Sequence, residues 1–153
     1  MQIMDIINSD LIQFGVDIKT KKQALQLISK LFVAQDSNLD EKEIYHALLA
    51  REKLGSTIVG HGVAIPHCKN SQITDPIACI IRLKSYIDFS SSSYQKVNLI
   101  FGLIVPENNN NEHLRILSKI ASLIDDKNIR DKLYKTQNPE DILIALNQYS
   151  EEH

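Results

Sequence analysis

The sequence predicts an α/β protein: a single domain in which helices pack on one β-sheet. Segments with the helical spacing of apolar residues come first, at 20–35 and 40–54, and continuous runs rich in β-branched residues follow at 77–83 and 97–105. Three further helical segments lie between 112 and 149. Helices at both ends of a chain and strands in its middle are most simply accommodated by a sheet with helices packed on it.

The two N-terminal helices have clear start and stop signals. Thr20 with Gln23, and Asp40 with Glu43, have the spacing of a capping box. Gly55 is typical of the position just past a helix end and is expected to end the second helix. The apolar stripes predicted for these helices are Leu25, Ile28, Leu31 and Phe32 in the first, and Ile44, Tyr45, Leu48 and Leu49 in the second.

The middle of the chain reads as strands and loops. The runs 77–83 and 97–105 have the pattern of strands that are covered on both faces. Gly60 and Gly62 interrupt the short apolar segment 56–67. The serine run 90–93 and the asparagine run 108–111 are predicted to be loops.

Three helices are predicted after the last strand. The segment 112–124 is expected to bury one apolar face, and 129–135 reads as a short connecting helix. Asn138 as N-cap and Pro139 at the first helical position mark the start of the last helix. The face predicted for 112–124 consists of Leu114, Leu117, Ile120, Ala121 and Ile124.

Composition favours a cytoplasmic globular protein. The 153 residues are 43% hydrophobic and 24% charged, with a formal net charge of −2, so nothing suggests binding to nucleic acid or to an anionic lipid surface. The longest apolar run has nine residues, well short of the roughly twenty that a membrane helix needs. The N-terminus lacks the pattern of a secretory signal, and two cysteines do not make a disulfide framework.

His67 is the first candidate functional residue. Pro66 fixes its own backbone and cannot donate to a sheet ladder, so we expect His67 to lie where a strand leaves the sheet, a common position for functional groups. A rigidly held imidazole could serve as a nucleophile. The alternative is a structural turn whose histidine has no chemical role.

Arg51 and His113 are candidates for an anion site near His67. Arg51 follows Ile44 by seven positions, on the rim of its helix's apolar stripe, and an inward guanidinium needs an anionic partner or a stacked ring. An ion pair with a nearby carboxylate would explain it equally well. His113 lies in the first turn of a predicted helix, where free N–H groups favour an anion.

Other chemistries fit poorly. The "GHG" at 60–62 lacks the Gly-x4-Gly-Lys-Ser/Thr pattern of a phosphate-binding loop. Cys68 follows His67 directly, so on an extended backbone their side chains point to opposite faces and cannot form a nucleophile–base pair. His61, His67, Cys68 and His113 do not have the usual spacing of zinc ligands. We therefore expect neither a metal nor a cofactor.

Two longer motifs, "REKLGSTIVGHGVAIPHCK" (51–69) and "LIVPENNNNEHL" (103–114), resemble the phosphotransferase-system IIA domain of the mannitol/fructose type. Together with "IIRLKSYIDF" and "KVNLIFGLIVPE" they are most similar to its nitrogen-regulatory branch, and the similarity covers nearly the whole chain. The resemblance implies a mixed β-sheet flanked by helices, spanning 1–153 as a single domain. It also implies that His67 carries a phosphoryl group, with Arg51 and His113 beside it.

The implied activity is phosphoryl transfer from a carrier protein of the HPr or NPr type to His67. Arg51 would keep the ring neutral and stabilise the phosphoryl oxygens, His113 could donate a hydrogen bond, and Ser56 and Thr57 are candidate hydroxyl donors. The family usually has a small residue at Cys68 and Asn or Asp at His61, so we expect these two residues to alter the rim of the site more than its centre, with their effect on partner choice left open.

Two outputs are compatible with that activity. As a regulator, the protein would select targets such as a sensor kinase or a transporter by its phosphorylation state. As a sugar-uptake component, it would pass the phosphate to a IIB domain of the fructose or mannitol type. We expect the regulatory role to dominate, because the motifs favour the nitrogen-regulatory branch and the sequence contains no fused IIB or membrane segment.

Overall fold

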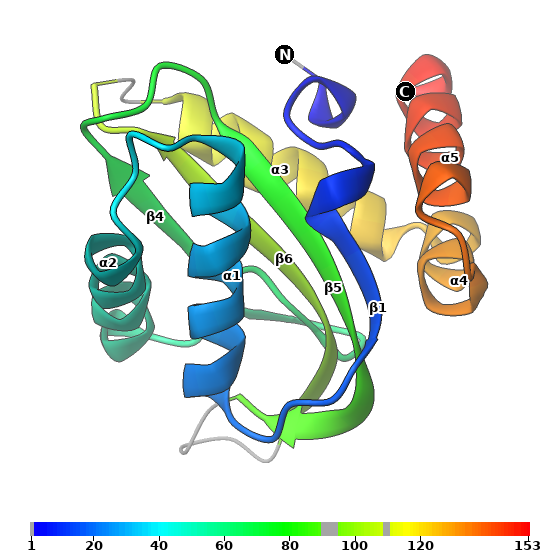
Figure 1. Ribbon diagram of the computed structural model, residues 1–153. Helices are drawn as coiled ribbons and strands as arrows, with labels where there is room; N and C mark the ends of the chain where they lie inside the picture. Colours follow the sequence, from blue (N-terminus) through cyan, green and yellow to red (C-terminus); the bar gives the residue numbers. More distant parts are fainter. Residues whose placement is uncertain (1, 90–94, 109–110) are drawn as a thin grey trace.

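The computed structural model describes residues 2–89, 95–108 and 111–153, which form a mixed β-sheet flanked by helices (Figure 1). The predicted fold class is confirmed. Two 3-10 turns, Ile3–Asp5 and Ser9–Leu11, precede the first strand. The strands are β1 (Ile12–Val16), β2 (Ile58–Gly60), β3 (Val63–Ala64), β4 (His67–Asn70), β5 (Ile77–Asp88) and β6 (Lys96–Pro106), and the helices are α1 (Lys21–Gln35), α2 (Glu41–Leu54), α3 (Glu112–Asp125), α4 (Lys127–Lys135) and α5 (Pro139–Glu152).

The antiparallel pair β5–β6 forms the centre of the sheet, and its side chains are buried along most of both strands, as the continuous apolar runs predicted. β1 pairs with β5 in parallel, and β2 pairs with β3 in an antiparallel arrangement. β3 and β4 both run parallel to β6 and follow one another along it, with Ile65 and Pro66 between them. The carbonyl of Pro66 still accepts a hydrogen bond from Leu103 N at 3.0 Å, so the proline interrupts this line without detaching it.

The helix boundaries follow the capping signals closely. Thr20 and Gln23 form both hydrogen bonds of a capping box at the start of α1. Asp40 accepts from Glu43 N at α2, but the Glu43 side chain does not accept from the Asp40 backbone N–H, so that predicted box is only half confirmed. α2 ends before Gly55, as predicted. The N-cap Asn138 and the first helical residue of α5, Pro139, are confirmed.

Helices cover both faces of the sheet. α1 and α2 lie side by side on one face, α3 lies behind the sheet, and α4 and α5 pack together beyond the β1 edge (Figure 1). The four residues expected to form the stripe of α1 are all buried. The face predicted for α3 was partly wrong, because Leu114 is 57% exposed. The buried residues of α3 are Ile116, Ile120, Leu123 and Ile124.

β1 was not predicted as a strand. The strand has only five residues, and its pairing register with β5 shifts near Gly15, where φ is 64°. This irregularity interrupts the alternation of side chains from which a strand is predicted. The serine run 90–93 lies outside the described residues, and the asparagine run 108–111 is described only at its ends, both in turns. Among the described helices, none has the length and apolarity that a bilayer crossing requires.

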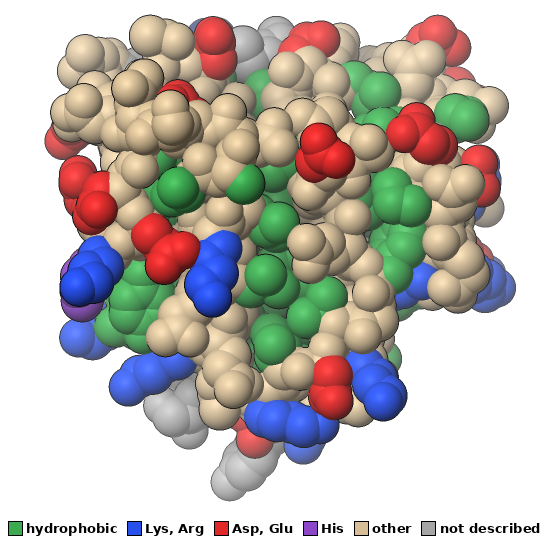
Figure 2. All heavy atoms as spheres, in the orientation of Figure 1, with side chains coloured by type: hydrophobic (Ala, Val, Ile, Leu, Met, Phe, Trp, Pro, Cys, Tyr) green, Lys and Arg blue, Asp and Glu red, His purple; other side chains and the backbone are tan. Residues whose placement is uncertain are grey.

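Charge is unevenly distributed over the surface despite the small net charge. On the face viewed in Figure 1, Lys and Arg side chains gather toward the lower half, where α2 ends, and Asp and Glu side chains are more frequent in the upper half (Figure 2). The cationic half of this face therefore borders the segment that connects α2 to the strands.

Candidate functional site

The three candidate residues line one cleft of about 520 Å³. Arg51 comes from the last turn of α2, His67 is the first residue of β4, and His113 is the second residue of α3. The cleft is thus formed where one helix ends, a strand begins and a second helix begins. The remaining residues that line it are Ala47, Ala50, Leu54, Cys68, Lys69, Leu103 and Val105.

His67 is the first residue of β4, so it lies where a strand begins. The prediction that it lies where a strand leaves the sheet was wrong. The ladder pairing of β3 with β6 ends at Ala64, and that of β4 with β6 begins at His67, which pairs with Leu103. The imidazole Nδ1 lies 2.8 Å from the Ile65 carbonyl oxygen. A carbonyl can only accept, so Nδ1 carries the proton and, in the neutral ring, Nε2 keeps its lone pair.

The surroundings of His67 favour that neutral ring. Burial is the main cause that lowers its pKa below the ordinary value of 6.5, and the Arg51 and His113 side chains lower it further. The hydrogen bond to Ile65 raises the pKa and is second in size to burial, ahead of the effects of Arg51 and His113. At neutral pH the ring is therefore unprotonated at Nε2 and can act as a nucleophile.

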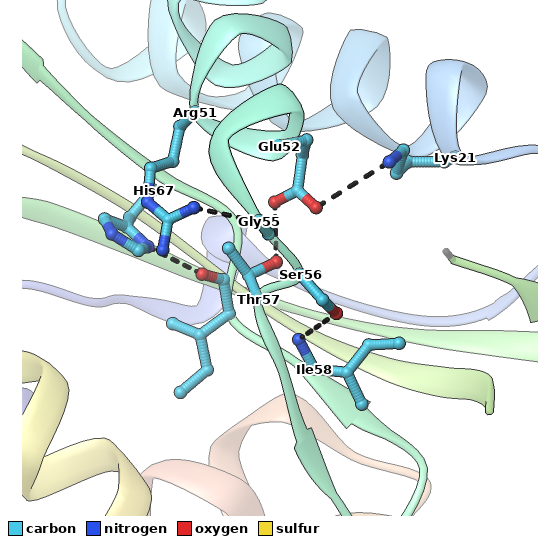
Figure 3. Close-up of polar contacts among 9 residues, drawn as sticks. Lys21, Arg51, Glu52, Gly55, Ser56, Thr57, Ile58 and His67 are labelled. Carbon is cyan, nitrogen blue, oxygen red and sulfur yellow. Dashed lines mark hydrogen bonds and ion pairs between the residues drawn. The ribbon is translucent and has the colours of Figure 1, made fainter. Parts of the chain in front are cut away.

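Arg51 faces His67 and forms no ion pair with a carboxylate of the described residues. Its Nη1 donates to the carbonyl oxygen of Gly55 at 2.9 Å, which anchors the guanidinium over the turn that follows α2. Figure 3 shows the guanidinium and the imidazole directed toward the same space. The remaining N–H groups of the guanidinium can bind a planar or tetrahedral anion held between the two side chains.

His113 adds a second ring to the cleft. Its Nδ1 is buried and has no hydrogen-bond partner among the described residues. Burial lowers the pKa of His113, and the charge of Lys69 contributes in the same direction. The Asn111 side chain forms no capping hydrogen bond with α3, and the positive end of the helix dipole at this terminus favours an anion.

The two candidate hydroxyl donors are arranged differently from the three residues above. Thr57 is buried and its hydroxyl donates to Glu52 at 2.6 Å. The Ser56 hydroxyl oxygen accepts from Ile58 N at 3.1 Å, and in Figure 3 this side chain points away from His67. A role for either hydroxyl in phosphate binding stays a prediction, and Thr57 would have to give up its bond to Glu52.

Two further charged residues near the site were missed. Glu52 is 6% exposed, although it follows Arg51 in a motif rich in charge. The signal was present, since Glu52 continues the buried stripe of Ile44 and Leu48 at intervals of four residues. Lys69 follows His67 by two positions in β4, so both side chains belong to the same face of the strand and both line the cleft.

Cys68 and His61 have different relations to the cleft. Cys68 borders it and is buried, which raises the pKa of its thiol to about 12 and keeps it uncharged. His61 lies instead in the turn between β2 and β3, with φ of 55°, and its Nε2 is 4.0 Å from Asp125 at the far end of α3 from His113. The expectation that His61 alters the rim of the site is therefore wrong.

The arrangement can accept a small anionic group. It offers a neutral nitrogen nucleophile, a guanidinium facing it, and the positive dipole end of a helix whose second residue, His113, lines the cleft. Within the described part of the chain, no three His, Cys, Asp or Glu side chains are grouped so that they could hold a metal ion. Transfer of a phosphoryl group needs little else from a protein than such positioning and charge stabilisation.

Comparison with known proteins agrees with this chemistry. The family model for the EIIA 2 component of the phosphoenolpyruvate-dependent sugar phosphotransferase system matches residues 5–149. The nitrogen regulatory proteins of Pseudomonas aeruginosa (40% identity over 114 residues, 74% of each chain) and Bradyrhizobium diazoefficiens (37% over 146 residues, 95% of each chain) are similar in sequence. The crystal structure of nitrogen regulatory protein IIA-Ntr from Neisseria meningitidis matches with a TM-score of 0.87 and 34% identity, covering 94% of this chain and 98% of that one.

Proposed function

The chain belongs to the EIIA type 2 family of the phosphoenolpyruvate-dependent sugar phosphotransferase system, and on that premise we propose that it is a phosphoryl carrier whose acceptor atom is Nε2 of His67. The observation that carries the proposal is the hydrogen bond from His67 Nδ1 to the Ile65 carbonyl, which leaves Nε2 as the nucleophilic nitrogen. Residues 1–153 would act as one domain in this role, in the cytoplasm.

The reaction exchanges one phosphorus–nitrogen bond for another. The Nε2 lone pair of His67 attacks the phosphorus of a phosphohistidine on a small carrier of the HPr or NPr type. The bond between that phosphorus and the carrier's ring nitrogen breaks, and the carrier's nitrogen takes back the electron pair. The phosphoryl oxygens gather charge in transit, and Arg51 stabilises them, with His113 as a further donor and the positive dipole end of α3 adding to the field.

Apolar side chains around the cleft support docking of a protein donor. Leu54 of α2, which lines the cleft, is 85% exposed, and Leu114, the neighbour of His113 in α3, is 57% exposed. Large apolar side chains that are exposed beside a reactive group are typical of a surface that a partner covers. The carrier would exclude water from the phosphoryl group while these side chains hold it in place.

Phosphorylation would also change what the protein binds. A neutral ring would become a group with close to two negative charges in a cleft that contains Arg51 and Lys69. The similar proteins from Pseudomonas aeruginosa and Bradyrhizobium diazoefficiens are named nitrogen regulatory proteins. We therefore assign a mainly regulatory output, in which the phosphorylation state selects a target such as a sensor kinase or a transporter.

The test of acceptor identity is transfer from the phosphorylated carrier to wild-type protein and to His67→Ala. The variant should take up no acid-labile phosphate, and persistent labelling would reject His67 as the acceptor. His46→Ala is the matched control, because His46 is an exposed residue of α2 outside the cleft. Its labelling should equal that of the wild type.

The second candidate function is transfer to a IIB domain for sugar uptake, which the family's description as a sugar phosphotransferase system favours. A growth assay and a binding assay distinguish sugar uptake from regulation. Failure of a deletion strain to grow on one particular sugar would favour uptake. A target protein that binds only one phosphoform of the wild type, with growth on sugars unchanged, would favour regulation.

A further inference from the structure

A buried carboxylate–hydroxyl pair lies at the end of α2 and in the turn that follows it, outside the residues that line the cleft. The Glu52 side chain is only 1% exposed, and its Oε2 accepts from the Thr57 hydroxyl at 2.6 Å. Its Oε1 has no hydrogen-bond partner among the described residues, and the nearest cation, Lys21 Nζ, lies 3.9 Å away. Burying a carboxylate with one hydrogen bond and one distant cation is unfavourable for stability. The pair therefore calls for an explanation other than stability of the fold.

Thr57 connects this pair to the segment that orients His67. The Thr57 carbonyl oxygen accepts a hydrogen bond from Ile65 N at 2.9 Å. The Ile65 carbonyl in turn accepts from His67 Nδ1 at 2.8 Å. The backbone of Ile65 therefore links the two residues: its N–H bonds to Thr57 and its carbonyl to the His67 ring. Ile65 itself is 3% exposed.

The turn between α2 and β2 is held at two points by consecutive residues of the helix. Arg51 donates to the Gly55 carbonyl, and the Glu52 carboxylate accepts from the Thr57 hydroxyl (Figure 3). The Gly55 N–H also donates to the Glu52 carbonyl at 3.3 Å. A shift of this turn would move the Thr57 carbonyl, and with it the Ile65 peptide that accepts the ring proton.

We propose that Glu52 and Thr57 are positioning residues that hold the Ile65 carbonyl in place and so keep His67 as the Nδ1–H tautomer with Nε2 directed into the cleft. This inference rests on the proposed function of His67 as phosphoryl acceptor. The wrong tautomer would carry a proton on Nε2 and could not attack phosphorus. A ring free to rotate would also lose the alignment that in-line transfer requires.

The test compares variants that break the pair with variants that keep it. The double variant Glu52→Met/Thr57→Val removes both polar groups together, so neither is left buried without a partner and the fold is retained. Glu52→Gln keeps an acceptor for the Thr57 hydroxyl and is the matched control. The nitrogen-15 shifts of the His67 ring report the tautomer, and transfer from the phosphorylated carrier reports the function.

The wild type and Glu52→Gln should show one tautomer, with the proton on Nδ1. The double variant should show a mixture and should accept phosphate at least about 10-fold more slowly. Wild-type nitrogen shifts and rate in a folded double variant would overturn the inference, as would a mixed tautomer in Glu52→Gln. If the wild type takes no phosphate from the carrier, the proposed function fails, yet the tautomer comparison still decides whether the pair positions the ring.

Discussion

Replacing Leu54 with Ala should weaken binding of the phosphorylated carrier without disturbing the fold. Leu54 is 85% exposed at the end of α2, so its loss should change the free energy of unfolding by less than about 0.5 kcal/mol. If the carrier covers the side chain, the removed carbon atoms forfeit about 2 kcal/mol of apolar burial in the complex. That energy corresponds to a rise of about 30-fold in KM for the carrier, with kcat unchanged.

The assay is the initial rate of phosphoryl transfer measured over a range of carrier concentrations. Ile144→Ala is the matched control, because Ile144 is an aliphatic residue 55% exposed on α5 and takes no part in the cleft. Its KM should equal that of the wild type. An unchanged KM in Leu54→Ala, or an equal rise in both variants, would refute the assignment of the cleft rim as the carrier's docking surface.

Three further predictions concern charge and packing. Arg51→Met should slow phosphoryl transfer by about 10²-fold or more. Because Arg51 lowers the pKa of His67, the variant should also lose activity at a higher pH than the wild type as the solution is made more acidic. An acid limb of the pH–rate profile at the wild-type position would contradict this. Gly102→Ala should lower the free energy of unfolding by about 1–3 kcal/mol, because the added Cβ would lie 2.6 Å from Cys79 Sγ. Urea unfolding measures this, and a midpoint equal to that of the wild type would contradict the prediction. Burial raises the pKa of Glu52 above its ordinary 4.5, so the folded state binds that proton more tightly than the unfolded state. The free energy of unfolding should therefore fall as the pH rises from the ordinary pKa of Glu52 through its raised value. In Glu52→Gln this part of the pH dependence should be absent, and a pH dependence identical to that of the wild type would contradict the prediction.

Local signals in the sequence were sufficient for most of the helices. Thr20 with Gln23 at α1, and Asn138 with Pro139 at α5, act through neighbouring backbone groups, so the bonds they form can be inferred without knowing the tertiary structure. The face of α3 could not be assigned in this way. Leu114 has the spacing of a core residue, yet its side chain is 57% exposed, and the buried face of α3 begins at Ile116.

Residues that depend on distant partners were predicted less well. The direction in which His67 meets the sheet depends on β6, more than thirty positions along the chain, and Pro66 signals only a break in the ladder. The sequence indicated that Arg51 and His113 turn inward, but their common cleft requires the packing of α2 and α3 around β4. The bond between Glu52 and Thr57 was missed because a glutamate beside an arginine is usually solvated, and only its register with Leu48 indicated burial.

The central claim is tested most directly by nitrogen-15 and phosphorus-31 NMR of the wild-type protein after transfer from the phosphorylated carrier. The account predicts one phosphohistidine, at position 67, with phosphorus coupled to Nε2 and the proton retained on Nδ1. Phosphate attached to Nδ1 of that ring, or to another residue, would contradict it.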